Sequence, residues 1–276
     1  MPHATSNTMA SPYNLSGRTA IVTGSSTGNG RAIAMSLAQA GADIICIDLH
    51  PGQPKGFEPD SPHTHDLVAQ QFGVRSIFHQ GDVTQEATWE EVVKKTLELT
   101  GRIDILVNNA GILGFVAPLH QLTLAQWQVV MNVNLNAVFL GIRAVIPIML
   151  KQEAREGGVR GSIISIASNA AFHGAAEKAP YCASKGALVA MNKTLAVDYG
   201  RQGIKCTTVS PGIIATALNA AELADPTKCI NYRSQTPWPR FGRVDEVGSA
   251  VLFLASDASD YCNGTDLLMD AGYVHA

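Results

Sequence analysis

Five short, mainly apolar runs recur along the sequence, at residues 20–22, 44–47, 103–107, 163–167 and 206–209. They lack the regular alternation of apolar and polar residues that is typical of a strand with one face in water. Strands that are apolar on both faces lie in the middle of a sheet that is covered on both sides, and parallel sheets are built in this way. The runs therefore predict a buried, mainly parallel sheet.

Longer segments with a helical spacing of apolar residues separate these runs, at residues 31–40, 87–99, 124–150 and 184–199. When strands alternate with helices, right-handed crossovers connect neighbouring parallel strands. We therefore expect an α/β fold, in which a doubly wound parallel sheet carries helices on both faces.

Length and composition favour one large domain. At roughly 100–200 residues per domain, 276 residues allow one domain or two, and no internal repeat or linker divides the chain. The chain is 46% hydrophobic and 16% charged, which excludes an intrinsically disordered protein. We expect a flexible N-terminal tail at residues 1–14 and a single domain at residues 15–276.

The charge and the N-terminal segment argue against nucleic-acid and membrane partners. A net charge of -3 provides no cationic field that would attract phosphates or anionic lipids. The first residues lack the basic and apolar regions of a secretory signal, and no run of 18 apolar residues occurs. We therefore expect a cytoplasmic protein that binds neither nucleic acid nor a membrane.

Neither a disulfide framework nor a metal site is expected. The cysteines are odd in number, widely spaced and without a C-x-x-C pair. His63 and His65 lie near Asp60 and Asp66, but no further ligands follow at a recognisable metal-site spacing, which favours a hydrophilic loop. The five cysteines are Cys46, Cys182, Cys206, Cys229 and Cys262.

Two segments show neither the strand nor the helix pattern. Residues 50–62 contain four prolines and two glycines and are expected to form an exposed loop, whose role stays open. Residues 217–240 connect a strand-like run to the next helix. Because long loops inside compact domains are often lids or binding loops, we expect a substrate lid there.

A glycine-rich segment at residues 23–30 (TGSSTGNG) follows the first apolar run and precedes a helix. Glycines permit a tight turn, and the start of a helix presents free N–H groups to a pyrophosphate. A simple strand-to-helix turn has a similar sequence. However, Asp48 follows Gly30 by 18 residues, after the second run, close to where dinucleotide folds place the carboxylate that binds the ribose. This order of elements favours a dinucleotide site.

Asp48 favours NAD(H) over NADP(H) as the cofactor. A carboxylate accepts hydrogen bonds from the adenosine ribose hydroxyls and repels a 2′-phosphate. Neither Leu49 nor Thr27 supplies a cation that would offset this repulsion. Lys55 would supply one if the loop at residues 50–62 folded back, so NADP(H) stays open as the alternative.

Tyr181 and Lys185 are four residues apart, which places them one turn apart on a helix. A phenol has a pKa of about 10, and a nearby cation favours its ionised form, so the pair can transfer a proton. The spacing alone is common by chance. Ser168, however, lies 13 residues before Tyr181 at the end of the run 163–167, where its hydroxyl projects from the carboxyl edge of the sheet.

Together these features resemble the short-chain dehydrogenase/reductase family over nearly the whole chain. Residues 23–30 resemble its T-G-x-x-x-G-x-G motif, and residues 108–111 match its N-N-A-G motif. Tyr181 and Lys185 match its Y-x-x-x-K pair, and Ser168 its serine. The further matches are Asp82 and Val83 for the adenine contact, Asn134 for the fourth catalytic residue, and residues 211–216 for the P-G-x-x-x-T segment.

The resemblance implies a Rossmann fold of about seven strands and hydride transfer between NAD(H) and a secondary alcohol or ketone. Tyr181 is then the general acid/base, Lys185 lowers its pKa and holds the nicotinamide ribose, and Ser168 orients the substrate oxygen. Asn134 anchors a water in a proton relay. The implied cofactor-binding residues are Gly24, Ser26, Thr27, Gly28, Asn29, Gly30, Asp48, Asp82, Val83, Asn109, Ala110, Gly111, Tyr181, Lys185, Pro211, Gly212, Ile214 and Thr216.

The resemblance also implies an assembly and a lid. Family members form homodimers or homotetramers through long helices, here residues 124–150 and 184–199. The lid at 217–240 contains Trp238, which we expect to cover a hydrophobic or cyclic substrate. We expect three further residues of this segment to cover the substrate together with Trp238, namely Asn219, Leu223 and Tyr232.

The sequence departs from the family pattern at two motif positions, and two alternatives to the leading hypothesis stay open. Asn29 replaces the usual Ile or Leu of the glycine motif, and Ala271 stands within the usual D-G-G. One alternative is an NADP(H)-dependent carbonyl reductase of the same family. The other is a catalytically silent dinucleotide-binding or scaffold protein, against which the intact catalytic residues argue.

Overall fold

The structure is a computed structural model that describes residues 11–52 and 62–276. Most of the tail predicted at residues 1–14 and most of the loop predicted at residues 50–62 lie outside these ranges, as do Lys55 and Asp60. Leu15, which follows directly on the predicted tail, is already fully buried.

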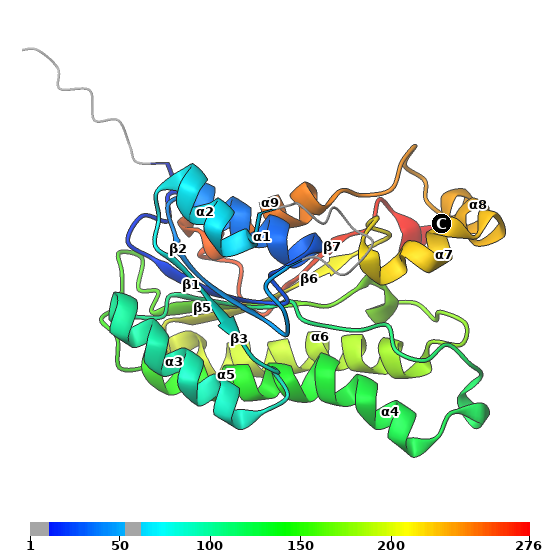
Figure 1. Cartoon of the computed structure of the whole chain (residues 1–276), viewed down its shortest axis with the longest axis horizontal. Helices are drawn as coiled ribbons and strands as arrows, with labels where there is room; N and C mark the ends of the chain where they lie inside the picture. Colours follow the sequence, from blue (N-terminus) through cyan, green and yellow to red (C-terminus); the bar gives the residue numbers. More distant parts are fainter. Residues whose placement is uncertain (1–10, 53–61) are drawn as a thin grey trace, which may run out of the picture.

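Within the described ranges, seven strands form one parallel sheet in the order β3-β2-β1-β4-β5-β6-β7 (Figure 1). Each strand pairs with its neighbour in parallel; for example, Ile21 of the first strand lies opposite Ile45 on one side and Leu106 on the other. The strands are β1 (Thr19–Thr23), β2 (Asp43–Asp48), β3 (Ser76–Gln80), β4 (Ile105–Asn108), β5 (Gly161–Ile166), β6 (Ile204–Pro211) and β7 (Asp266–Met269).

Two layers of helices cover the sheet (Figure 1). One layer consists of α1 (Gly28–Gln39), α2 (Thr64–Phe72) and α9 (Val244–Ala255). The other consists of α3 (Glu86–Thr100), α4 (Leu124–Met131), α5 (Ala137–Met149) and α6 (Ala179–Tyr199). Short 3-10 turns lie at Leu119–Gln121, Asn169–Ala171, Gly200–Gln202, Ala217–Asn219, Asp257–Ser259 and Tyr273–His275.

The side chains of the central strands enter two separate hydrophobic cores, one on each face of the sheet. In β2, Ile44 and Cys46 pack into the core that contains the residues of α1 and α9. Ile45 and Ile47 pack into the core that contains the residues of α3 and α5. This alternation follows from the two-residue period of a strand, and it explains why the runs are apolar throughout.

The predicted α/β fold with a doubly wound parallel sheet is confirmed, and each of the five apolar runs overlaps a strand. The runs do not mark β3 and β7, which are the edge strands of the sheet. Most residues of β3 and all of β7 are only partly buried. An edge strand has a neighbour on one side only, so its sequence carries a weaker apolar signal.

The helix predicted at residues 124–150 is divided. A π-helical turn, Asn132–Asn136, separates α4 from α5, and Pro147 lies inside α5. By length and composition, Leu124–Met149 would also suffice to cross a membrane, with a mean hydropathy of 1.7 over 18 residues. In the fold, Val138, Ile142 and Met149 of this segment pack into the core on one face of the sheet. Burial in this core explains the apolar composition of the segment.

Truncation of a central core residue tests the packing of the sheet. Ile45 is fully buried, so I45A is expected to lower the free energy of unfolding by about 2–5 kcal/mol through lost transfer energy and a cavity. Urea unfolding measures the change. I230A serves as the matched control, because Ile230 is 67% exposed and its truncation is expected to change stability by less than about 0.5 kcal/mol.

Candidate active site

A cavity of about 830 Å³ opens at the carboxyl edge of the sheet. The loops that follow β1, β2, β4, β5 and β6 all reach it. In a doubly wound sheet, ligands bind at this edge where the strand order reverses, here between β1 and β4. All the catalytic and cofactor-binding residues predicted from the sequence line the cavity, except Ser26 and Asn134.

The glycine turn between β1 and α1 allows a ligand to approach the protein backbone closely. Gly24 and Gly28 have positive φ angles of 63° and 51°, which favour glycine. A Cβ atom on Gly30 would lie 2.0 Å from the carbonyl oxygen of Gly24, so no larger residue fits. Helix α1 begins at Gly28 without a side-chain cap, which leaves its first N–H groups available to a pyrophosphate. The turn therefore fits a dinucleotide.

Asp48, the last residue of β2, lines the same cavity. Its Oδ2 accepts a hydrogen bond from the backbone N–H of Ser26 at 3.0 Å, and its Oδ1 accepts one from Leu49 N–H at 2.8 Å. The hydroxyl of Ser26 donates instead to the carbonyl of His50 at 2.5 Å. Ser26 thus positions Asp48 and does not line the cavity, in contrast to its predicted contact with the cofactor.

The loops after β3 and β4 supply the next part of the wall. Asp82 and Val83 line the cavity, and Asp82 Oδ1 accepts hydrogen bonds from the backbone and hydroxyl of Thr84 at 2.9 and 2.8 Å. The backbone N–H groups of Asn109 and Ala110 donate to the Thr23 hydroxyl oxygen at 2.9 and 3.0 Å. These bonds fix the loop after β4 against β1 at the point where the cavity opens.

Tyr181 and Lys185 lie on the first turns of α6, and both side chains reach the cavity. The Lys185 Nζ atom lies 5.8 Å from the centre of the Tyr181 ring and donates a hydrogen bond to the carbonyl of Ile166 at 2.7 Å. Because burial disfavours a charge, it lowers the pKa of Lys185 to about 8. Lys185 thus ionises within the pH range in which many enzymes work.

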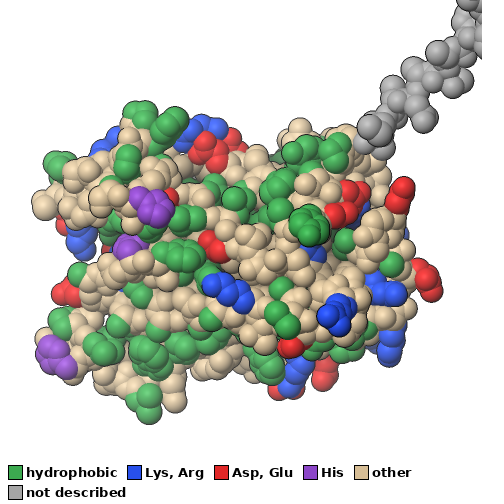
Figure 2. All heavy atoms as spheres, turned by 180° about the vertical axis from the view of Figure 1, so that it is seen from behind, with side chains coloured by type: hydrophobic (Ala, Val, Ile, Leu, Met, Phe, Trp, Pro, Cys, Tyr) green, Lys and Arg blue, Asp and Glu red, His purple; other side chains and the backbone are tan. Residues whose placement is uncertain are grey.

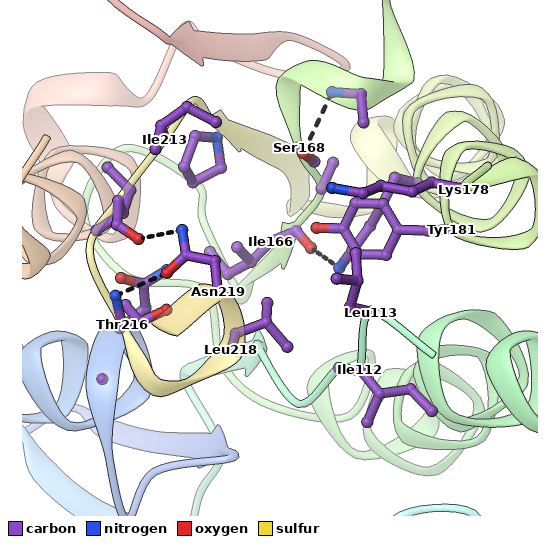
Figure 3. A pocket seen from close by; sticks show the side chains of 18 of the residues that line it. Ile112, Leu113, Ile166, Ser168, Lys178, Tyr181, Ile213, Thr216, Leu218 and Asn219 are labelled. Atoms are coloured by element: carbon purple, nitrogen blue, oxygen red, sulfur yellow. Dashed lines mark hydrogen bonds between the residues drawn. The ribbon is translucent and has the colours of Figure 1, made fainter. Parts of the chain in front are cut away.

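Ser168 follows β5, and its side chain lies close to Tyr181 at the cavity (Figure 3). Its Oγ accepts a hydrogen bond from Ala170 N–H at 3.2 Å, which holds the side chain in place. Burial raises the pKa of Tyr181 above the usual phenol value, while the Ser168 hydroxyl and the Lys178 ammonium oppose that rise. The phenol therefore depends on its polar neighbours to give up its proton.

Asn134 lies in the π-helical turn and is fully buried. Its side-chain oxygen accepts a hydrogen bond from Ile112 N–H at 2.8 Å, and its amide donates to the Ile112 carbonyl and the Ser184 hydroxyl at 2.9 and 3.1 Å. Both amide N–H groups therefore have protein acceptors. A Cβ on Gly111 would lie 3.4 Å from both Asn134 Oδ1 and Lys185 Nζ, so Asn134 positions the loop beside Lys185.

The expected lid consists of helices rather than a loop. After Thr216 come a 3-10 turn, α7 (Ala220–Ala224) and α8 (Pro226–Ser234). Asp225 caps α8 by accepting hydrogen bonds from two backbone N–H groups at 2.9 and 3.3 Å. This segment looks like a loop in the sequence because α8 begins with a proline and its cap is a polar residue. Both residue types are also common in loops.

The lid residues at the cavity differ from the predicted set. Asn219 and Tyr232 line it, as expected, but Leu223 and Trp238 do not. The Trp238 side chain is 59% exposed, so the expectation that it covers the substrate is wrong. No motif singles out Lys178, Glu222 or Gln235, which line the cavity together with His173 and Tyr273.

The histidine and aspartate cluster begins a helix rather than forming a loop. His63 is the N-cap of α2, and His65 and Asp66 lie in its first turn. One potential metal-binding atom from each residue lies within 4.8 Å of the others. Asp60 lies outside the described residues. His65 also packs against Phe78, with ring centres 5.4 Å apart, which gives it a structural role.

The fold and site define a dinucleotide-dependent oxidoreductase, and comparisons with known proteins agree. Residues 24–274 match a family model described as enoyl-(acyl carrier protein) reductase. The chain is 38% identical to 2-(R)-hydroxypropyl-CoM dehydrogenase from Xanthobacter autotrophicus over 93% of this chain and 98% of that protein. It is 36% identical to D-threitol dehydrogenase from Mycolicibacterium smegmatis, over 95% of this chain and 94% of the relative.

Solved structures show the same similarity. Levodione reductase has a TM-score of 0.84 at 31% identity, covering 95% of this chain and 100% of its own. A protein described as an NAD(P)-dependent gluconate 5-dehydrogenase from Beutenbergia cavernae, with NADP bound at low occupancy, has a TM-score of 0.83 at 33% identity; 96% of this chain and 100% of that one are covered. The chain belongs to the short-chain dehydrogenase/reductase family and is an NAD(P)-dependent oxidoreductase that acts on CH–OH groups.

Removal of the phenol hydroxyl tests the role of Tyr181. Y181F is expected to reduce kcat by about 10²–10⁴-fold, because general acid/base catalysis contributes that much. The reduction is measured from nicotinamide absorbance, and NADH binding, followed by fluorescence, is expected to be retained. Y199F, at the other end of α6 and outside the cavity, is the matched control and is expected to keep its activity.

The pKa of Lys185 predicts a pH dependence of stability. This pKa is about 8 in the folded protein and 10.5 without the fold, so the unfolded chain binds more protons between these values. The free energy cost of burying the ammonium is therefore fully present below pH 8 and is relieved as the pH rises towards 10.5.

Replacing Lys185 by Met removes this titration. The free energy of unfolding of K185M minus that of the wild type is expected to be larger at pH 7 than at pH 9.5, by about 2 kcal/mol. Urea unfolding at both pH values measures it. K193M, from an exposed position on α6, controls for loss of a lysine; an equal pH effect in both variants would contradict the prediction.

Proposed function

We propose that the protein uses NAD(H) in preference to NADP(H), and that Asp48 determines the preference. Its carboxylate lies at the end of β2 on the cavity wall, held from one side by two backbone N–H groups. Such bonds leave each oxygen able to accept a further hydrogen bond from a ribose hydroxyl. A 2′-phosphate at this position would face a fixed negative charge.

The positions of the cations support this proposal. Among the described residues that line the cavity, the lysines are Lys178, Lys185 and Lys228. Lys178 and Lys185 flank Tyr181, and Lys228 belongs to α8 of the lid. None of the three belongs to β1, β2 or the turns that follow them, where Asp48 lies. One structural relative has NADP bound. A preference for NADP(H) is therefore the competing outcome of the kinetic experiment on Asp48.

The arrangement of side chains suggests how the reaction proceeds. When bound, the nicotinamide accepts or supplies the hydride. Tyr181 takes the alcohol proton during oxidation and returns it to the ketone oxygen during reduction. Ser168 donates a hydrogen bond to that oxygen, and the Lys185 ammonium, held by the Ile166 carbonyl, favours the ionised phenol.

The substrate end of the cavity accommodates a small alcohol or ketone with an apolar side. Ile112, Leu113 and Leu218 line it and project from two opposite loops (Figure 3). These apolar groups support the expected hydrophobic or cyclic substrate, and one structural relative is a levodione reductase. Polar lid residues face the same space, so the substrate also carries polar groups.

Exposed apolar side chains support self-association as a homodimer or homotetramer. Figure 2 shows hydrophobic side chains over the lower helical layer, which contains α6. Phe139 on α5 and Val197 on α6 are 49% and 80% exposed, and exposed apolar helices of this kind offer a symmetric contact between two copies of the chain.

All five cysteines are free thiols, which supports the proposed cytoplasmic location.

Replacement of Asp48 tests the cofactor preference. D48S is expected to lower kcat/KM for NAD⁺ by about 10–100-fold and to raise it for NADP⁺, because the ribose loses its acceptor and the phosphate loses a repulsive charge. Steady-state kinetics with both cofactors measure the change. D198S, at an exposed position on α6, controls for the loss of one charge. A wild-type preference for NADP⁺ would refute the proposal.

A further inference from the structure

Three polar side chains outside the family motifs meet at the substrate end of the cavity. Lys178 precedes α6, Glu222 lies in α7 and Tyr232 in α8. Lys178 Nζ lies 2.7 Å from Glu222 Oε1 and donates hydrogen bonds to Oε2 at 2.9 Å and to the Tyr232 hydroxyl at 3.2 Å. The Tyr232 hydroxyl donates to Glu222 Oε2 at 3.1 Å. We call these three residues the Lys178 cluster.

The Lys178 cluster lies beside the reacting groups. All three members line the cavity, and Lys178 precedes Tyr181 by three residues. The two side chains lie next to each other, and the Lys178 ammonium extends towards Ser168 (Figure 3). The charge of Lys178 also acts on the Tyr181 phenol. A substrate whose oxygen lies between Ser168 and Tyr181 therefore has its neighbouring carbon close to Lys178.

Packing alone does not require charges at this position. The side chains of Lys178 and Glu222 are each only 14% exposed. An ion pair buried to this extent loses much of its hydration, and apolar residues of similar size often stabilise a protein equally well. Together with Tyr232, the pair joins the start of α6 to both lid helices, so the cluster can contact a substrate that the lid encloses.

The hydrogen-bonding capacity of the cluster indicates the group that it recognises. An ammonium has three donors, and three oxygen atoms of the cluster lie within 3.2 Å of Lys178 Nζ. The Glu222 carboxylate still keeps lone pairs to accept a further bond. A substrate hydroxyl supplies the donor for that bond. A carboxylate or sulfonate would be repelled by Glu222, and a methyl group offers no donor.

We propose that the Lys178 cluster is a specificity determinant that recognises a hydroxyl group on the carbon next to the reacting carbinol. The preferred substrates are then vicinal diols and polyols rather than simple secondary alcohols. This inference rests on the proposed placement of the reacting oxygen between Ser168 and Tyr181. The apolar side of the cavity contacts the carbon skeleton, while the cluster contacts the second oxygen.

The test compares alcohols that differ by one hydroxyl group. The pairs are butane-2,3-diol with butan-2-ol, and trans-cyclohexane-1,2-diol with cyclohexanol, each oxidised with NAD⁺. The wild type is expected to favour the diol in kcat/KM by about tenfold or more, because a site built for a hydroxyl discriminates strongly against its absence. A symmetric diol offers two equivalent carbinols, so only a preference above about threefold supports the inference.

Variants of the cluster are expected to lose this preference selectively. In K178M, E222Q and Y232F the ratio of kcat/KM for the diol to kcat/KM for the simple alcohol is expected to fall at least about fivefold. The ratio is the readout, because the charge of Lys178 also acts on the Tyr181 phenol and its removal changes the activity towards both alcohols. K178M leaves Glu222 without its cation, so the double variant K178M/E222L supplies an apolar pair that preserves folding. K193M, from the exposed face of α6, is the matched control and is expected to keep the wild-type ratio.

The outcomes separate this inference from the proposed function. If the wild type oxidises both members of a pair equally well, or turns over neither diol, the inference is overturned. It is also overturned if K178M/E222L keeps the full preference for the diol. The cofactor assignment depends instead on D48S and the acid/base assignment on Y181F, so each of these can fail while the diol preference stands.

Discussion

The parallel pairing of β1 with β4 is the constraint on which the rest of the structure depends. The strand order runs outward from this pair in both directions, so the loops that leave the two strands diverge and open the cavity between them. The Thr23 hydroxyl at the end of β1 accepts hydrogen bonds from Asn109 and Ala110 after β4. The glycine turn, Asp48 and the catalytic residues all take their positions relative to this opening.

Burial and charge act in opposition around Tyr181. The same desolvation that raises the pKa of the phenol above 10.0 lowers the pKa of Lys185 from 10.5 to about 8, so burial makes Lys185 the more acidic of the two groups. Lys178 adds a second cation, and Glu222 compensates its charge. The ion pair of Lys178 and Glu222 thus lies beside the catalytic phenol, and the charge of Lys178 acts on that phenol.

Much of the fold and of the cofactor site was predictable from local sequence. Buried central strands must be apolar on both faces, which produces continuous apolar runs in the sequence. The turn at Gly30 excludes a Cβ atom, which produces a glycine motif. The edge strands β3 and β7 left weaker ones because they are partly exposed. Ser26 and Asn134 do not line the cavity. They position neighbouring groups through backbone and side-chain hydrogen bonds, which a motif does not reveal.

The sequence by itself determined the α/β architecture and the class of reaction, and it supplied the candidates for the reacting side chains, because these depend on periodicity and on short motifs. Only the tertiary structure decided which lid residues meet the substrate. Trp238 is the obvious apolar candidate but points to solvent, whereas Lys178, Glu222 and Tyr232 converge from segments up to 54 residues apart. That convergence depends on how α7 and α8 pack over the cavity, and no local pattern encodes such long-range contacts.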